Sequence, residues 1–200
     1  MSKKLILGSS SPYRKSLLKR LNIPFTCISP NIDETIYESE TASNAVKRLA
    51  YEKATNIANT LNDKPYLIIG SDQIAVLEET ILGKPGNLEK AYSQLSLFSG
   101  KKVNFLTSLC VLDKQTQKYE LSINSYSVYF RKLTHNEILY YLQTEQPFDC
   151  AGSFKCEGLG IALFEKMEGS DPNSLIGLPL IDLCNALRKM GLNPLSYESS

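Results

Sequence analysis

Two patterns of hydrophobic residues divide the chain into expected strands and helices. Short apolar runs are typical of buried strands, and they occur at residues 4–7, 25–29, 66–69, 74–77, 81–82, 103–112, 119–130 and 161–164. Apolar residues three and four positions apart are typical of helices, and this spacing occurs at residues 12–21, 43–61, 88–98, 134–142 and 178–190. Strands and helices are mixed, with a run of antiparallel strands in the middle. The expected fold class is therefore α/β, a mixed twisted sheet with flanking helices.

The overall composition limits the size and the partners of the protein. The chain has 200 residues, of which 42% are hydrophobic, enough for a single domain over residues 1–200 or for two lobes around a cleft. Lysine and arginine total 22 against 21 aspartate and glutamate, a formal net charge of +1. Such a balance gives no field that favours bulk binding to nucleic acid or to a membrane surface, although a few local cations suffice for one small anion.

Targeting features and cysteine usage favour a cytoplasmic protein. The apolar stretch at residues 5–7 is too short for a secretory signal, and no window approaches the roughly 20 apolar residues of a membrane span. The five cysteines are scattered, and only Cys150 and Cys156 are near each other, without a second Cys/His pair. Reduced thiols are therefore expected, and a zinc site is disfavoured.

A serine-rich segment, residues 9–14, joins the first expected strand to the first expected helix. Ser11 suits the N-cap of this helix and Pro12 suits its first turn. A helix N-terminus has free backbone N–H groups and a partial positive charge, so it favours anions, and Arg14 adds a guanidinium that can clamp phosphate oxygens. The alternative is an ordinary serine-capped helix with a surface arginine.

Two acidic segments are candidates for metal binding or proton transfer. Asp72 follows the most apolar strand, residues 66–69, which is expected to end at Gly70; ligands in α/β sheets lie beyond the carboxyl ends of strands. A turn aspartate is the alternative. The loop that carries Asp33 and Glu34 offers further carboxylates, of the kind that Mg²⁺ uses together with substrate phosphates. A solvated loop is the better interpretation for Asp33, and the two interpretations are close for Glu34.

Three further charged residues carry weaker signals. Lys53 lies on the helix over residues 43–61 among polar neighbours, so a charged outer face is the alternative to a role at the site. Lys84 lies in a Gly-X-Pro turn, where a rigid backbone can aim it inward. Glu157 lies in a glycine-rich loop that can approach a ligand closely and accept hydrogen bonds from a base edge. The alternative for Glu157 is a surface loop with a charge pair.

Together these segments resemble one family, the Maf-like nucleoside triphosphate pyrophosphatases. The resemblance spans nearly the whole chain, and its motifs follow in the family's order and spacing. They are SSSPYR at residues 9–14, NIDET at 31–35, YEKA at 51–54, GSDQ at 70–73, GKP at 83–85, AGSFKCEGLG at 151–160 and DPNSLIGLPL at 171–180. Several ordered motifs are far more specific than any one of them.

The resemblance implies a function and a set of residue roles. Such enzymes hydrolyse a nucleoside triphosphate between the α and β phosphates with a divalent cation, Mg²⁺ or Mn²⁺, in the cleft of an α/β fold that is often dimeric. By motif, Asp72 resembles the catalytic proton acceptor, and Glu34 with Asp72 would bind the metal. The residues that would hold the triphosphate are Ser10, Arg14, Lys53 and Lys84.

Three positions resemble the base selectors of this family: Tyr13, Gln73 and Glu157. The subgroup that acts on 7-methyl-GTP has an aromatic residue, usually Trp, with Gln and Glu, whereas the dTTP and UTP subgroup has Arg, Thr and Gln. This sequence matches the first, with Tyr in place of Trp. The methylated ring is positively charged and stacks on an aromatic face, and its N1–H and N2–H₂ edge donates to a carboxylate.

Other functions remain as alternatives. One is a dTTP or UTP pyrophosphatase of the same family. Another is a nucleotide-binding regulator of cell division without turnover, which would not need Asp72 and Glu34. A nucleic-acid-binding module has only the cluster Arg14, Lys15, Lys19 and Arg20 in its favour, and a solvated helix face explains that cluster better. The expected partner is thus a small nucleoside triphosphate, with a homodimer possible.

Overall fold

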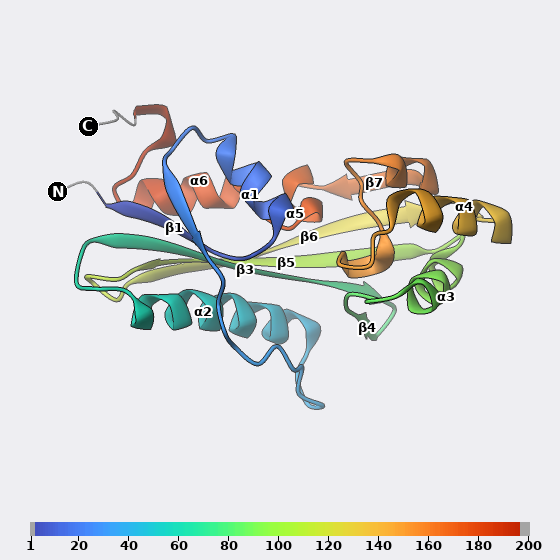
Figure 1. Cartoon of the computed structure of the whole chain (residues 1–200), viewed down its shortest axis with the longest axis horizontal. Helices are drawn as coiled ribbons and strands as arrows, with labels where there is room; N and C mark the ends of the chain where they lie inside the picture. The colour runs from blue at the N-terminus through green and yellow to red at the C-terminus, as the bar shows by residue number, and fades with distance from the viewer. Residues whose placement is uncertain (1–2, 197–200) are drawn as a thin grey trace.

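The computed structural model describes residues 3–196, which are built on one seven-stranded mixed sheet (Figure 1). The strands are β1 (Lys4–Gly8), β2 (Phe25–Ile28), β3 (Tyr66–Leu77), β4 (Thr80–Leu82), β5 (Lys102–Asp113), β6 (Tyr119–Phe130) and β7 (Phe164–Gly169). Their order is β2-β1-β3-β5-β6-β7, with β4 paired to β3. β1 is parallel to β2 and β3, and the other pairs are antiparallel. The expected α/β class with a mixed sheet is confirmed, and the division into two lobes stays a prediction.

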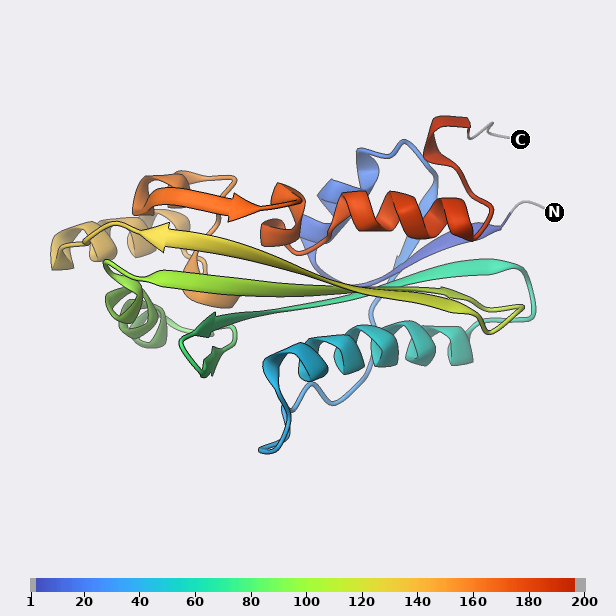
Figure 2. The same ribbon diagram turned by 180° about the vertical axis from the view of Figure 1, so that it is seen from behind.

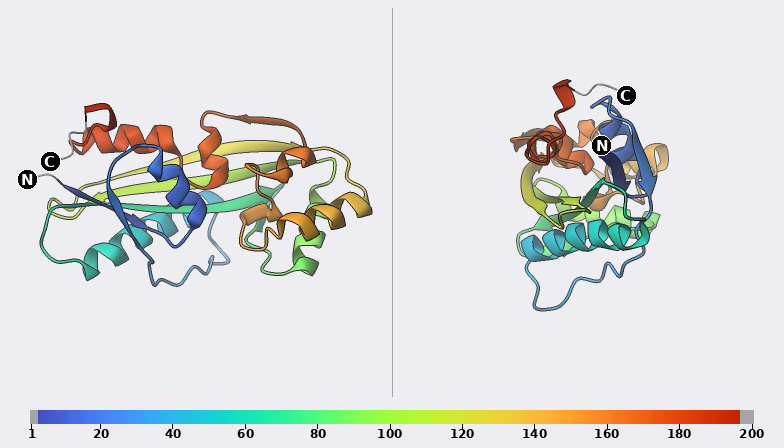
Figure 3. Two further views of the ribbon diagram at one scale, coloured as in Figure 1. Left: turned by 45° about the horizontal axis from the view of Figure 1, so that its top comes forward. Right: turned by 90° about the vertical axis from the view of Figure 1, so that its left-hand side faces the viewer.

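Helices cover both faces of this sheet. The α-helices are α1 (Pro12–Lys19), α2 (Ala42–Thr60), α3 (Leu88–Phe98), α4 (His135–Glu145), α5 (Pro172–Ile176) and α6 (Leu180–Lys189), and the 3₁₀ helices are η1 (Ala151–Ser153), η2 (Leu159–Leu163) and η3 (Pro194–Ser196). α2 lies on one face, and α1 and α6 lie on the other (Figures 1 and 2). The end-on view shows the sheet between α2 and α6 (Figure 3). None of the described helices is long and apolar enough to cross a membrane.

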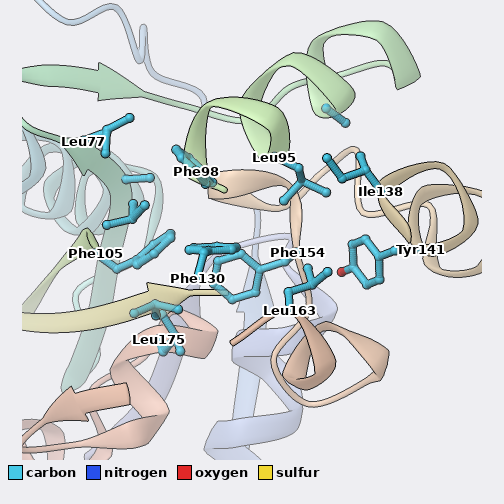
Figure 4. Close-up of a cluster of buried hydrophobic side chains, with 14 of the residues drawn as sticks. Leu77, Leu95, Phe98, Phe105, Phe130, Ile138, Tyr141, Phe154, Leu163 and Leu175 are labelled. Atoms are coloured by element: carbon cyan, nitrogen blue, oxygen red, sulfur yellow. The ribbon is translucent and has the colours of Figure 1, made fainter. Parts of the chain in front are cut away.

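Strand alternation sends neighbouring side chains of β3 into different cores. Leu67 and Ile69 pack with the buried leucines of α1 and α6, whereas Ile68 packs with Ala54 and Ile57 of α2. A third core lies where α3 and α4 cover the start of β5 and the end of β6. Figure 4 shows its aromatic centre, in which Phe154 meets the ring edges of Phe105 and Phe130.

The strand expected to end at residue 69 in fact continues to Leu77, so the sequence-based boundary was wrong. Residues 67–76 of β3 pair continuously with β5, and this long-range partner supplies backbone hydrogen bonds through the glycine. Gly70 allows a close approach of α2, since a Cβ there would lie 2.1 Å from the carbonyl oxygen of Ala50. Asp72 therefore lies in the middle of a strand and not beyond its end.

Two other boundaries differ from expectation. Residues 161–164, expected as a strand, belong mostly to η2, and β7 starts only at Phe164. The reason is that β6 ends at Phe130, which already pairs with Phe164. The helix expected over residues 178–190 begins at Leu180, and the separate helix α5 precedes it, because Gly177 adopts a left-handed φ of 116° that ends α5.

The register of β3 leaves part of one edge open. β1 pairs with residues 66–69 and β4 pairs with residues 75–77. Among the described strands, residues 70–74 therefore have a neighbour only on the β5 side. The carboxyl end of β1, where α1 begins, adjoins this opening. The rule that ligands lie at strand ends therefore applies here to β1 rather than to β3.

Candidate active site

The turn from β1 into α1 presents a helix N-terminus. Ser11 is the N-cap, and its hydroxyl accepts a hydrogen bond from the backbone N–H of Arg14 at 3.4 Å. Ser9 is buried and its hydroxyl accepts from the backbone N–H of Ser11 at 3.1 Å, which fixes the turn. Pro12 occupies the first turn as expected. The exposed Ser10 is left at the rim of a cavity.

This cavity has a volume of about 260 Å³ and is bordered by segments from across the chain. All but one of the residues assigned a role from the sequence line it. They are Ser10, Tyr13, Arg14, Glu34, Lys53, Gln73, Lys84 and Glu157. Asp72 is the exception: it is 7% exposed and lies behind Lys53. The sequence motifs thus converge on one place.

Glu34 and Asp72 meet at a single ammonium group. Lys53 Nζ lies 2.7 Å from Oε1 of Glu34 and 2.6 Å from Oδ1 of Asp72. Lys53 is only 5% exposed, which rules out the alternative of a charged outer face. The side chain of Glu34 is 53% exposed and faces the cavity, whereas Asp72 is buried behind Lys53.

The depth of Lys53 follows from how closely α2 approaches β3. Gly70 has no side chain, and Ala50 and Ala54 of α2 present only small ones to it. Because α2 approaches the strand so closely, Lys53, three residues after Ala50, reaches Asp72 on the same face of the sheet. No local sequence pattern carries this signal, since it depends on a contact between distant segments.

The loop that carries Glu34 is anchored by Arg48 of α2. Arg48 donates to the backbone carbonyl of Thr35 at 3.0 Å and to Oε2 of Glu40 at 2.7 Å. Asp33 accepts from the backbone N–H and the hydroxyl of Thr35, at 2.9 and 2.6 Å. Asp33 is therefore a turn residue, which agrees with the solvated-loop interpretation, and Glu34 is the carboxylate turned to the cavity.

Helix α5 and the glycine that ends it supply backbone carbonyls to Arg14, Ser71 and Gln73. The carbonyl of Gly177 accepts from Arg14 Nε at 2.8 Å and from the Ser71 hydroxyl at 2.9 Å. The carbonyls of Ser174 and Leu175 accept from Gln73 Nε2. Sequence reasoning treated this segment only as a family motif, because a five-residue helix has too little periodicity to detect.

A buried carboxylate holds α5 in place. Asp171 is fully buried, and its Oδ1 accepts from the backbone N–H of Asn173 at 2.9 Å. Its Oδ2 accepts from the backbone N–H of Ile181 at 2.8 Å. One side chain thus caps α5 and ties it to the start of α6. The Asp and Pro of the DPNS motif are thereby explained, since Pro172 occupies the first turn.

Burial and nearby charges shift the pKa values of two cavity residues. Burial lowers the pKa of Arg14, and the nearby carboxylates of Asp72 and Glu34 oppose this shift. Burial acts to raise the pKa of Glu34, but the hydrogen bond and charge of Lys53, with Lys84 and Arg14, outweigh it and leave the pKa below its ordinary value. Glu34 is therefore an anion surrounded by cations at neutral pH.

The opposite end of the cavity is formed by the segment from Asp149 to Glu157. Tyr13 donates to Oδ1 of Asp149 over a long 3.4 Å, and burial raises the pKa of the tyrosine hydroxyl. Phe154 anchors this segment in the aromatic core, where it is 5% exposed. Glu157 is exposed at the cavity wall. Asp149 was not singled out from the sequence, although it lies two residues before the glycine-rich motif.

Two cysteines also border this end, and neither is activated. Burial raises the pKa of Cys150 and of Cys156 to about 12. Thiols in this state are poor nucleophiles at neutral pH. All five cysteines are free in the described residues. The structure thus gives these two residues a place at the cavity wall without a reactive thiolate.

The carboxylates can hold a metal only in a particular way. Among the described residues no group of three or more His, Cys, Asp or Glu side chains could form a protein cage for an ion. Glu34 and Asp72 do converge on one cationic atom, which shows that both can contact a single positive centre. Mg²⁺ is usually bound by one or two carboxylates together with substrate phosphates. The pair fits that kind of site.

Comparison with sequence families and curated proteins points to one family. The family model described as Maf-like protein matches residues 4–190. A protein of Colwellia psychrerythraea called 7-methyl-GTP pyrophosphatase is 50% identical over 98% of both chains. One of Pseudoalteromonas atlantica with the same name is 52% identical over 95% of this chain and 96% of its own. A solved structure, the Staphylococcus aureus Ham1 protein, has a TM-score of 0.38 and 14% identity over 64% of this chain and 72% of that one, too distant to carry an argument.

Proposed function

Because this chain belongs to the Maf-like protein family, we propose that it hydrolyses a nucleoside triphosphate to a monophosphate and pyrophosphate, with 7-methyl-GTP as its preferred substrate. The observation that carries the proposal is the meeting of Glu34 and Asp72 at Lys53, on the floor of a cavity lined with cations. This arrangement combines an anion-binding wall with a pair of carboxylates, as cleavage of a phosphoanhydride requires.

The triphosphate binds along the wall formed by the start of α1. Free backbone N–H groups and the helix dipole favour phosphate oxygens there, and Ser10 adds a hydroxyl donor. Arg14 is held through Nε by the Gly177 carbonyl, so its terminal nitrogens remain for the phosphates. The exposed Lys84 lies at the same cavity and adds a positive charge.

Glu34 and Asp72 hold the divalent cation, Mg²⁺ or Mn²⁺, together with the phosphates. When bound, the metal supplies positive charge that polarises the phosphate oxygens. Asp72 also accepts a proton from the attacking water, and for this its oxygen must be released from the Lys53 ammonium. Lys53 then pairs with phosphate oxygens, which offer it a stronger negative partner than the carboxylates.

The base binds at the end formed by Tyr13, Gln73 and Glu157. The cationic ring of 7-methylguanine stacks on the Tyr13 side chain, and Glu157 accepts hydrogen bonds from the N1–H and N2–H₂ edge. Uracil and thymine present carbonyl acceptors that a carboxylate repels. A cavity wall with Glu157 therefore favours the methylated guanine.

A substrate panel tests the proposal. Purified protein is incubated with Mg²⁺ or Mn²⁺ and 7-methyl-GTP, GTP, UTP or dTTP, and released pyrophosphate is measured. We expect the highest kcat/KM for 7-methyl-GTP and no turnover after chelation of the metal. A clear preference for UTP or dTTP would overturn the substrate assignment, and binding without pyrophosphate release would support a regulator instead.

The proposal extends to where and in what form the enzyme acts. Five free thiols suit the reducing cytoplasm, where structural disulfides are rare. We propose that the active form of the enzyme is a homodimer. Size-exclusion chromatography with light scattering tests it, and a monomer at assay concentration would remove that part of the proposal.

A further inference from the structure

The side-chain amide of Gln73 is surrounded on one side by hydrogen-bond acceptors. Its Nε2 lies 2.8 Å from the carbonyl oxygen of Ser174 and 3.0 Å from that of Leu175. It also lies 3.0 Å from the hydroxyl oxygen of Thr107. Gln73 and Thr107 are directly opposite each other on β3 and β5, so their side chains share one face of the sheet.

The hydroxyl of Thr107 can only accept from Gln73. Thr107 is fully buried, and its single proton is donated to the carbonyl of Ser174 at 2.8 Å. The two backbone carbonyls have no proton to give. A reversed amide would place the oxygen of Gln73 against two carbonyl oxygens, which is unfavourable. The contacts therefore fix which end of the amide faces inward.

Because the nitrogen of the Gln73 amide faces inward, its oxygen faces the cavity. Gln73 lines the cavity that also holds Glu157, and no hydrogen bond within the described residues uses its Oε1. The base end then presents a neutral acceptor from Gln73 and a charged acceptor from Glu157. Such a wall suits a base whose edge carries hydrogen-bond donors.

We propose that Thr107 is a positioning residue for base recognition, which locks the amide of Gln73 so that its carbonyl oxygen faces the nucleotide. The proposal rests on the function proposed above and names a residue outside its motifs. The two amide protons are shared among three acceptors, of which Thr107 is one, and Thr107 also fixes one of the other two, because its own proton ties the Ser174 carbonyl to the sheet. Thr107 never touches the substrate.

The lock is measured first in the nucleotide-free protein by NMR. The side-chain NH₂ signals of Gln73 are assigned from their loss in Gln73→Ala, and their exchange with water is compared with that of Gln115, an exposed glutamine in the turn after β5. We expect slow exchange for Gln73 in the wild type. Exchange as fast as that of Gln115 would overturn the proposal without any variant of Thr107.

Substitutions then test the role of the hydroxyl. Thr107→Val keeps the shape of the side chain and removes its hydroxyl, whereas Thr107→Ser keeps the hydroxyl and removes the methyl group. Ser108→Ala is the matched control, since this buried hydroxyl on the next residue bonds Ser122 and not Gln73. We expect faster exchange of the Gln73 amide in Thr107→Val only, with wild-type behaviour in the other two.

Kinetics give the functional readout. In Thr107→Val, KM for 7-methyl-GTP is expected to rise roughly three- to tenfold, the effect of one misplaced hydrogen bond, with kcat nearly unchanged. The KM for UTP should change less. Equal losses of kcat on all substrates would overturn the positioning role, as would an unchanged KM. A protected Gln73 amide with no preference for 7-methyl-GTP would refute the proposed substrate and leave the lock standing.

Discussion

Lys53 Nζ lies 2.6 Å from Oδ1 of Asp72, and this contact covers a carboxylate that is 7% exposed. Glu34 reaches the same ammonium from the cavity side. Without ligand, the two carboxylates therefore share one positive charge, which comes from a side chain of the protein itself. Substrate and metal must displace the Lys53 ammonium from the two carboxylates. Catalysis therefore requires Lys53, Glu34 and Asp72 to change partners.

Asp72→Asn tests the role of the carboxylate. The amide keeps the size of the side chain but accepts no proton, so we expect kcat to fall about 10²–10⁴-fold, the usual contribution of a general base. Lys53 loses one of two ionic partners, and a lower melting temperature should accompany the change. Pyrophosphate release and circular dichroism measure the two effects. Turnover near the wild-type rate would contradict the role.

Lys53→Met tests whether the ammonium competes with the metal. Removing it leaves Glu34 and Asp72 facing each other without a cation, so Mn²⁺ alone should bind at least about tenfold more tightly, or about 1.4 kcal/mol. Calorimetry without nucleotide measures this affinity. Lys84→Met is the matched control, because it removes a cavity cation and leaves the carboxylate pair with Lys53. Equal affinities in both variants would refute the competition.

The fold was predictable where local patterns decide it. The apolar spacing over residues 43–61 gave α2 to within a residue at each end, and Ser11 with Pro12 gave the start of α1. The end of β3 was not predictable, since its continuation depends on pairing with β5 about forty residues further along the chain. These long-range hydrogen bonds outweigh the turn propensity of Gly70.

The candidate site was predictable as a set of motifs but not as a geometry. The residue types and the order of the motifs identify Glu34, Asp72 and Lys53, and the structure brings these three side chains together. The burial of Lys53 was missed, because polar sequence neighbours indicate a solvated face. Thr107 was missed as well, since a threonine in the middle of an apolar strand has no motif and gains its meaning from Gln73 across the sheet.

Gly70→Ala tests the close approach of α2. A methyl group would lie 2.1 Å from the Ala50 carbonyl oxygen, so α2 must move, and we expect a loss of about 1–3 kcal/mol in the free energy of unfolding. Gly83→Ala is the control, since nothing lies within 4 Å of a Cβ there. Urea unfolding gives both values. A shift of α2 also moves Lys53, so kcat should fall in Gly70→Ala alone.

The thiols at the base end should react slowly, with a defined pH dependence. Burial raises the pKa of Cys150 and Cys156 to about 12, so the neutral thiol dominates below that pH. Iodoacetamide labelling followed by mass spectrometry should therefore show little reaction of either residue at pH 8 and an increase as the pH rises. Turnover at pH 8 should survive the reagent. Rapid labelling of either cysteine at neutral pH would contradict the buried, protonated state.

Tyr13→Trp tests the stacking half of base recognition. Tyr13 lines the cavity, and its hydroxyl makes a long contact of 3.4 Å to Asp149, so the substitution costs little there and enlarges the aromatic face. Trp is the best partner for a cation, and a gain of about 0.5–1 kcal/mol corresponds to a two- to fivefold higher kcat/KM for 7-methyl-GTP. GTP, whose ring is uncharged, should gain less, so the result is read from the ratio of kcat/KM for 7-methyl-GTP to kcat/KM for GTP.

Glu157→Gln tests the hydrogen-bonding half of base recognition. A neutral amide accepts less strongly from the N1–H and N2–H₂ edge, so this substitution should lower the same ratio of kcat/KM values while triphosphate affinity is kept. If both variants change the two substrates in parallel, the base lies elsewhere and neither residue selects it.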